Sequence, residues 1–306
     1  MNITDSIKKT EFRISEGVDG DIPFVVISGI EEFDASKVFD CGQCFRFDPF
    51  SDTKHRIEIC GVAMGRFLSF AEDGGDLIIY NADKAFFEDR LVHYLGLDLD
   101  YKKIREDIIS ATDEPYIKSS ALCGKGIRLL RQEKWEALCS FIISQNNNIP
   151  RIKKLISSLC ERCGEKIDGR NMLSHGARAE EYAFPSPEAV LSLGIDGLRE
   201  LKVGFRASYI YDAAKKIVSG ELDLQAISSL PSDDCLSELM KIKGVGLKVA
   251  SCTALFGMAK YDAFPIDVWI RRVLAEKFSP DFNYRVFGDY AGIAQQYMFY
   301  AARFDT

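Results

Sequence analysis

The pattern of apolar positions divides the chain into a strand-like first third and a helical remainder. Between about residues 12 and 98, short apolar runs such as FVVISGI and DLIIYNA are separated by turn signals such as DGGD. Such runs are typical of antiparallel strands. From Tyr101 onward, apolar residues recur every three or four positions, which indicates helices. The pattern predicts an α+β protein: a β-rich N-terminal domain over 1–115, with a helix or two, and a mostly α-helical two-part body over 116–306.

Helix boundaries inside the body follow from turn formers and prolines. The stretch 127–143 has the spacing of a buried amphipathic helix and should stop at the asparagines 146–148, since consecutive asparagines favour turns. Pro150 suits the opening of the next helix. Residues 168–183 are polar and irregular, and His175 within them is expected to be a loop residue.

One stretch near the C-terminus predicts two helices joined by a tight turn. Apolar spacing predicts a helix that ends near Met240, with Ser232 as its N-cap. In the turn KGVG, Gly244 and Gly246 stand where a hairpin needs positive φ or close approach by another backbone. A second helix restarts directly afterwards, with Lys248 at its first or second position. The pattern is a helix-hairpin-helix.

This arrangement indicates specific chemistry. The first amides of the second helix are unpaired and, with the helix dipole, form a site for a phosphate group. The positive end of the dipole disfavours an ammonium at Lys248, and a neutral amine is a nucleophile. Asp267 follows Pro265 and precedes the next apolar stripe, so it is the natural N-cap of a third helix. Alone, either Lys248 or Asp267 would more often be a solvated charge or a cap. Together they indicate a catalytic pair.

The same residues carry a family resemblance. GVGLKVASC, followed nineteen positions after Lys248 by PID, resembles the helix-hairpin-helix, Gly/Pro-rich loop and aspartate motif of the DNA glycosylase superfamily. The lysine resembles that of the bifunctional glycosylase/lyases, and the flanking residues narrow the resemblance to the 8-oxoguanine DNA glycosylases. The resemblance covers roughly Phe33 to Tyr300, and it places the helix-hairpin-helix at about 232–258 and the catalytic aspartate loop at 260–267.

The resemblance implies an activity. The enzyme would excise 8-oxoguanine from duplex DNA and cleave the abasic site by β-elimination, with Lys248 forming a Schiff base and Asp267 stabilising positive charge on the sugar. The lesion would be turned out of the helix into a pocket. Its N7 carries a hydrogen that guanine lacks, and the resemblance assigns the accepting carbonyl to Gly42 in DCGQCFRF. Gln295 would bond the Watson–Crick edge.

The resemblance also assigns groups of binding residues. Phe299 and Cys252 would stack on the two faces of the base, Phe205 would wedge into the gap, and Arg206 would contact the orphaned cytosine. The implied base pocket comprises Gly42, Cys252, Pro265, Gln295 and Phe299, and the implied DNA-binding residues are Asn146, Asn147, Arg151, Phe205, Arg206, Gly244 and Gly246.

At a few positions the chain departs from the family pattern. Trp269 stands where eukaryotic members carry histidine, Phe205 where they carry tyrosine, Cys44 where serine is usual, and Ser251 where aspartate often follows KVA. These departures leave the chemistry unchanged but bear on how strictly the base opposite the lesion is selected.

Composition restricts the partners and the compartment. A net charge of −7 argues against a partner held by bulk electrostatics, so DNA contacts must come from local basic spots and helix amides. Nine cysteines suit free thiols in a reducing compartment. Helix-hairpin-helix glycosylases of the endonuclease III type carry a four-cysteine iron–sulfur cluster after the motif, whereas no cysteine follows Cys252 here, so the resemblance implies no cluster. The two C-x-x-C pairs lie far apart and no histidine accompanies either, so we expect no other metal and no cofactor. The first residues lack a signal-peptide core and no run is long enough to span a bilayer, so we expect an intracellular monomer, in the cytoplasm or nucleoid if bacterial.

Three other functions are compatible with parts of the sequence. A glycosylase for another damaged purine would generally lack Lys248. A non-catalytic helix-hairpin-helix DNA-binding protein would not need Asp267, Gln295 and Phe299 together. A thiol redox protein could use the C-x-x-C pair of Cys41 and Cys44, provided that the two thiols reach each other and one is exposed.

Overall fold

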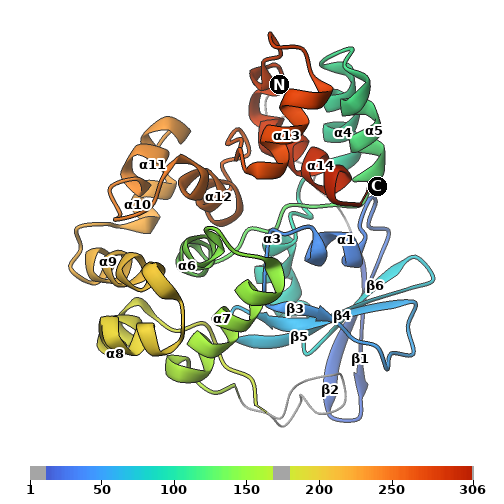
Figure 1. Cartoon of the computed structure of the whole chain (residues 1–306). Helices are drawn as coiled ribbons and strands as arrows, with labels where there is room; N and C mark the ends of the chain where they lie inside the picture. Colours follow the sequence, from blue (N-terminus) through green and yellow to red (C-terminus); the bar gives the residue numbers. More distant parts are fainter. Residues whose placement is uncertain (1–11, 168–179, 305–306) are drawn as a thin grey trace.

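The computed structural model describes residues 12–167 and 180–304 (Figure 1). Its N-terminal part is a six-stranded antiparallel sheet with strand order β1-β2-β6-β5-β4-β3. The predicted α+β class is therefore confirmed. The strands are β1 (Arg13–Asp19), β2 (Ile22–Ser28), β3 (Phe47–Pro49), β4 (Ile57–Ala63), β5 (Arg66–Asp73) and β6 (Asp76–Tyr80).

One short helix within the N-terminal domain packs on the sheet and fixes the loop that follows the helix. Between β2 and β3 the chain forms the short helix α1 (Ala35–Asp40), whose N-cap Asp34 accepts from the Lys37 amide at 3.1 Å. Phe39 of α1 packs against Phe47 and Phe70 of the sheet, with ring centroids 4.4 and 4.7 Å away. The loop directly after α1, which contains Gly42, is thereby fixed at one end of the sheet.

Helices dominate the described residues that follow the sheet. After β6 come α2 (Lys84–Phe86), a π-helical turn (Phe87–Leu91) and α3 (Val92–Tyr94). The body then contains α4 (Tyr101–Ser110), α5 (Pro115–Cys123), α6 (Lys134–Ser144), α7 (Ile149–Cys163), α8 (Pro187–Glu200), α9 (Ala207–Val218), α10 (Leu224–Ser228), α11 (Ser232–Leu239), α12 (Leu247–Met258), α13 (Val268–Lys277) and α14 (Ala291–Phe304), with short 3-10 turns at Gly204–Arg206 and Tyr284–Tyr290.

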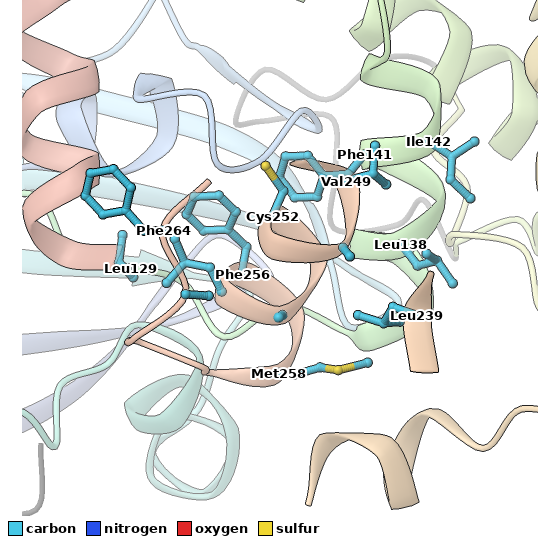
Figure 2. Close-up of a cluster of buried hydrophobic side chains, with 14 of the residues drawn as sticks. Leu129, Leu138, Phe141, Ile142, Leu239, Val249, Cys252, Phe256, Met258 and Phe264 are labelled. Carbon is cyan, nitrogen blue, oxygen red and sulfur yellow. The ribbon is translucent and has the colours of Figure 1, made fainter. Parts of the chain in front are cut away.

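The centre of the helical body is the packing of α12 against α6. Every residue of α12 from Val249 to Met258 is buried. Gly257 permits the close approach, since a Cβ there would lie 2.8 Å from the Cβ of Ala137 on α6. Phe141 of α6 stacks on Phe256 of α12 with ring centroids 5.4 Å apart, and Figure 2 shows both within a cluster of apolar side chains from several helices. The cluster holds the first turn of α12 in a fixed position.

The predicted helix over 127–143 was too long at its start. Only Lys134–Ser144 is helical, and the preceding residues are extended because their backbone groups bond to other segments. The Arg131 and Gln132 amides donate to the Tyr94 and Phe256 carbonyls, both at 2.9 Å. The apolar residues of this segment are buried between the sheet and the helices, which explains their pattern without a helix.

Other predicted boundaries can be compared directly. Helix α6 ends at Ser144 and α7 opens with a proline in its first turn, as predicted. Ser232 is not an N-cap: it is the first residue of α11, and its hydroxyl donates to Asp262 Oδ1 at 2.6 Å. His175 and most of the predicted polar loop lie outside the described residues. No helix within 12–167 and 180–304 has the length and hydrophobicity to cross a membrane.

Candidate functional site

The hairpin between α11 and α12 has two glycines with different structural requirements. Gly244 has φ +75°, and a Cβ there would lie 2.3 Å from the Tyr209 ring, so no other residue fits without displacing that ring. Gly246 is the N-cap of α12, makes no side-chain cap and has nothing within 4 Å of a built Cβ. The first amides of α12 are therefore uncapped by side chains and open to an anion.

Lys248 is the second residue of α12, as predicted, and is half-buried. Its Nζ lies 3.5 Å from Ser144 Oγ, at the end of α6, and 5.6 Å from the centroid of the Phe141 ring. The amine therefore projects toward the end of α6, with an aromatic face on one side and the neutral hydroxyl of Ser144 within hydrogen-bonding distance. Ser144 was not among the predicted site residues, because one serine before an asparagine run carries no distinguishing signal in the sequence.

Asp267 caps the next helix. Its Oδ1 accepts from the Ile270 amide at 2.8 Å at the start of α13, which confirms the predicted N-cap. Lys248 and Asp267 both act on the thiol of Cys252, one turn along α12. Burial raises the pKa of the Cys252 thiol, Lys248 opposes this rise, and the carboxylate of Asp267 adds to it. The amine, the thiol and the carboxylate thus share one partly buried region.

The predicted base-pocket residues come from distant parts of the chain. Gly42 lies against α14: its φ is +82°, and a Cβ there would be 3.1 Å from Phe299 Cε1 and 3.5 Å from Arg303 Nη1. Gln295, one turn before Phe299, is buried, and its Oε1 has no hydrogen-bond partner among the described residues. Pro265 is buried in the loop before Asp267. An unsatisfied buried amide oxygen requires an explanation, and a ligand that donates to it is one.

The predicted DNA-binding residues form a surface with one exception. Asn146 and Arg151 are exposed, Asn147 is half-exposed, and Phe205 is 52% exposed. Arg206 is buried instead. Its guanidinium donates to the Gln145 carbonyl from Nε at 2.9 Å and to the Asn146 and Val203 carbonyls at 3.1 Å. Arg206 thus fixes the asparagine turn and does not face solvent.

A thiol redox site at Cys41 and Cys44 is not supported. Both thiols are buried, and each donates to a carbonyl of α1, to Val38 at 3.3 Å and to Phe39 at 3.6 Å. Burial raises the pKa of Cys41 to about 12, so the reactive thiolate is disfavoured. All nine cysteines are free thiols, as predicted.

A separate cavity of about 130 Å³ lies between the sheet and α7, lined among others by Arg46, Lys153 and Cys160. None of the predicted catalytic or base-pocket residues lines it. We therefore assign the site from the side chains around Lys248 and not from this cavity.

Two family models together match most of the chain. Residues 25–138 match the N-terminal domain of 8-oxoguanine DNA glycosylase. Residues 139–282 match the HhH-GPD superfamily base excision DNA repair protein.

One solved structure and two curated relatives show how much of the chain is similar to known proteins. The 8-oxoguanine glycosylase/lyase of Clostridium acetobutylicum, solved with double-stranded DNA containing cytosine opposite 8-oxoG, is 35% identical with a TM-score of 0.84, and the match covers 96% of this chain and 98% of that one. The N-glycosylase/DNA lyase of Saccharomyces cerevisiae is 33% identical over 204 residues, 63% of this chain and 52% of the yeast protein. A probable N-glycosylase/DNA lyase of Methanothermobacter thermautotrophicus is 28% identical over 227 residues, 65% of this chain and 70% of that protein. The match thus spans about half the length of the yeast relative.

Proposed function

This chain belongs to the 8-oxoguanine DNA glycosylases of the HhH-GPD base excision repair superfamily, and from that premise we propose that it excises 8-oxoguanine from duplex DNA and then cleaves the abasic site. The observation that carries the proposal is the position of Lys248 in the uncapped first turn of α12, one turn before Cys252, with Asp267 held as the N-cap of α13. A structural lysine has no need of a rigid carboxylate cap and an open helix start beside it.

The chemistry follows from the positions of the two charged groups. A phosphate of the DNA backbone bound at the α12 amides brings the adjacent sugar to Lys248. The amine forms a bond to C1′ while the bond from C1′ to the base nitrogen breaks and the base leaves with the electron pair. Asp267 stabilises the positive charge that develops on the sugar. Because the helix N-terminus already orients its carboxylate, little reorganisation is needed at the moment of reaction.

The lyase step uses the same covalent bond. The amine loses its proton, the sugar ring opens, and a Schiff base forms between Lys248 and C1′. The imine makes a C2′ hydrogen acidic. Its removal expels the 3′ phosphate, which is the β-elimination that cuts the strand. Water then hydrolyses the imine and frees the lysine.

Base recognition is assigned to the face between Gly42 and α14. The base would stack on Phe299, with Cys252 on its other face and Pro265 at the rim. Gln295 Oε1, buried and without a partner among the described residues, would accept a hydrogen bond from the Watson–Crick edge. The Gly42 carbonyl would accept from the N7 hydrogen that guanine lacks, so guanine would lose this bond and place a lone pair against the carbonyl oxygen.

The DNA interface is proposed to depend on few cations. Gly244 and Gly246 present the α12 amides to one phosphate, and Phe205 is exposed where it can enter the gap left by the extruded base. Asn146, Asn147 and Arg151 would lie along the same strand. For Arg206 to contact the orphaned cytosine, its bonds to the Gln145 and Asn146 carbonyls would have to be exchanged for bonds to the base.

The domain boundary and the cellular compartment also stay predictions. The division of the chain at residue 115 falls at the first residue of α5, and α4 and α5 both contribute to the same buried cluster. As to the compartment, a duplex substrate would place the protein with the genome, which is the cytoplasm or nucleoid if the protein is bacterial. We propose that it acts as a monomer without metal or cofactor.

The alternatives differ in what they require of the site. A glycosylase for an alkylated purine would have no use for Lys248 as a nucleophile or for an N7-specific carbonyl at Gly42. A non-catalytic DNA-binding protein would show binding without strand cleavage. Product analysis on duplexes with 8-oxoguanine, 3-methyladenine or no lesion distinguishes all three.

The experiment that tests the role of Asp267 uses Asp267→Asn. Asparagine is as good an N-cap as aspartate, so the helix start and the fold should be kept while the charge is lost. We expect base release from 8-oxoguanine duplexes to fall by at least about 100-fold, since an electrostatic group of this kind supplies about 3 kcal/mol. The melting temperature should stay within a few degrees. Wild-type rates in this variant would remove Asp267 from the mechanism.

A further inference from the structure

Two glutamine side chains from the helical body hold the backbone on either side of Gly42. Gln296 Nε2, on α14, donates to the Cys41 carbonyl at 2.7 Å. Gln132 Nε2, in the extended segment before α6, donates to the Gln43 carbonyl at 2.6 Å. The carbonyls immediately before and after that of Gly42 are therefore both bonded to side chains from outside the sheet domain.

The Gln43 side chain fixes the same loop from inside. Its Nε2 donates to the Val38 and Arg128 carbonyls, each at 2.8 Å, and its Oε1 accepts from the Leu130 amide at 2.8 Å. This side chain is fully buried and uses both donors and its acceptor. The loop cannot shift without breaking several buried hydrogen bonds.

The Gly42 carbonyl differs from its neighbours. Within residues 12–167 and 180–304, no donor is hydrogen-bonded to it. Gln296 is only 2% exposed, and its neighbour Gln295 has the buried Oε1 without a partner. Buried helix positions rarely carry glutamine, so two in succession require a reason. The amide of the second is used to hold the Gly42 loop, whereas the oxygen of the first is unused within the protein.

We propose that Gln296 is a positioning residue that sets the place of the Gly42 carbonyl and thereby the preference for 8-oxoguanine over guanine. This inference rests on the proposed function. The bond from Gln296 fixes the Cys41–Gly42 peptide relative to α14, the helix that also carries Gln295 and Phe299. The Gly42 carbonyl, Gln295 and Phe299, which make the three proposed contacts to the base, are then all held in position by α14. The preference depends on a single hydrogen bond, whose strength falls steeply with misalignment, so a small shift of this peptide is enough to weaken it.

The experiment compares Gln296→Leu, which keeps the side-chain bulk and removes the donor, with the wild-type residue. In a Lys248→Gln background, which cannot cleave, dissociation constants are measured for matched duplexes carrying 8-oxoguanine or guanine opposite cytosine. The selectivity ratio is the dissociation constant for the guanine duplex divided by that for the 8-oxoguanine duplex. We expect this ratio to fall about tenfold in Gln296→Leu. With Lys248 present, 8-oxoguanine excision should fall by a similar factor, while cleavage of a preformed abasic site stays within about twofold.

Two further variants separate positioning from general loosening. Met298→Ala removes a buried side chain from the same helix but leaves the Gly42 loop untouched, so it should lower the melting temperature and leave the ratio unchanged. Gln132→Leu frees the carbonyl on the other side of Gly42 and should lower the ratio as Gln296→Leu does, which keeps the test decisive if one variant fails to fold.

The possible results distinguish a failure of the proposed function from a failure of the role inferred for Gln296. If the wild-type protein does not release 8-oxoguanine, the proposed function is wrong and this inference falls with it. If the wild-type protein is active but Gln296→Leu leaves the ratio unchanged, or lowers excision and abasic-site cleavage equally, Gln296 only supports the fold and the inference is overturned.

Discussion

Replacing Gly42 by alanine separates recognition of the lesion from cleavage of the sugar. The added Cβ would lie 3.1 Å from Phe299 Cε1, closer than ordinary van der Waals contact, so the ring must move by a few tenths of an ångström. The residue also has φ +82°, a conformation that costs an L-residue about 1 to 2 kcal/mol. The ring that would move is the one proposed to stack on the base. Strain and displacement therefore act on the same contact.

These costs predict the size of the effect. Stacking the base requires the loop and the Phe299 ring to keep their wild-type positions, so the strain of about 1 to 2 kcal/mol must be borne whenever the base binds. At about 1.4 kcal/mol per tenfold, this corresponds to a loss of roughly 5- to 30-fold in 8-oxoguanine excision. Cleavage of a preformed abasic site needs Lys248 and Asp267 but no base in the pocket, so it should stay within about threefold. Single-turnover rates on the two duplexes measure both. Comparable losses on the two substrates would refute the reasoning, because they would show that Gly42 only maintains the fold.

Two predictions concern the hairpin and the largely buried side chain of Glu136. Gly246→Ala should leave the melting temperature unchanged, since φ is −97° and a Cβ meets nothing within 4 Å, but should weaken duplex binding several-fold in a filter-binding assay because the Cβ crowds an incoming phosphate. Gly244→Ala, whose Cβ would strike the Tyr209 ring, should instead destabilise the protein by about 2 kcal/mol. A destabilised Gly246→Ala together with an undisturbed Gly244→Ala would contradict the assigned geometry. Burial raises the pKa of Glu136 to about 7, against the opposing effect of Arg46. The folded state then binds more protons than the unfolded state between about pH 4.5 and 7, so its contribution makes the free energy of unfolding fall as pH rises through that window. Denaturant titrations at pH 5 and 7.5 should show a fall that Glu136→Gln flattens, and an unchanged slope in that variant would remove Glu136 as its source.

Local chemistry made the hairpin and the caps predictable from the sequence. Glycines at the turn, an apolar stripe restarting at Leu247 and an aspartate before another stripe act within a few residues, and the structure has Lys248 and Asp267 at the expected helix positions. The same reasoning misplaced the cap at Ser232, because its hydroxyl bonds to Asp262, thirty residues away. A side chain can form a hydrogen bond either to a nearby backbone amide or to a group far away in the sequence. The local sequence pattern reveals only the nearby partners.

The contacts between distant segments could not be predicted in the same way. The extended run before α6 has a helical apolar pattern, but its amides bond to Tyr94 and Phe256. Arg206 was expected at a DNA surface, and it is buried under carbonyls of the asparagine turn. The role inferred for Gln296 depends on the Cys41 carbonyl 255 positions away. Each of these depends on the packed arrangement of elements that are far apart in the chain.

The central claim is that Lys248 is the nucleophile, and borohydride trapping on an 8-oxoguanine duplex tests it most directly. Hydride reduces a Schiff base to a stable amine, so the wild-type protein should become covalently attached to the DNA and migrate as a complex in a denaturing gel. Lys248→Gln keeps a good helix former at the second position of α12 and should bind the lesion duplex without attachment. The exposed hairpin lysine offers a matched control, and Lys243→Gln should trap as the wild-type protein does. A covalent complex formed by Lys248→Gln would contradict the account.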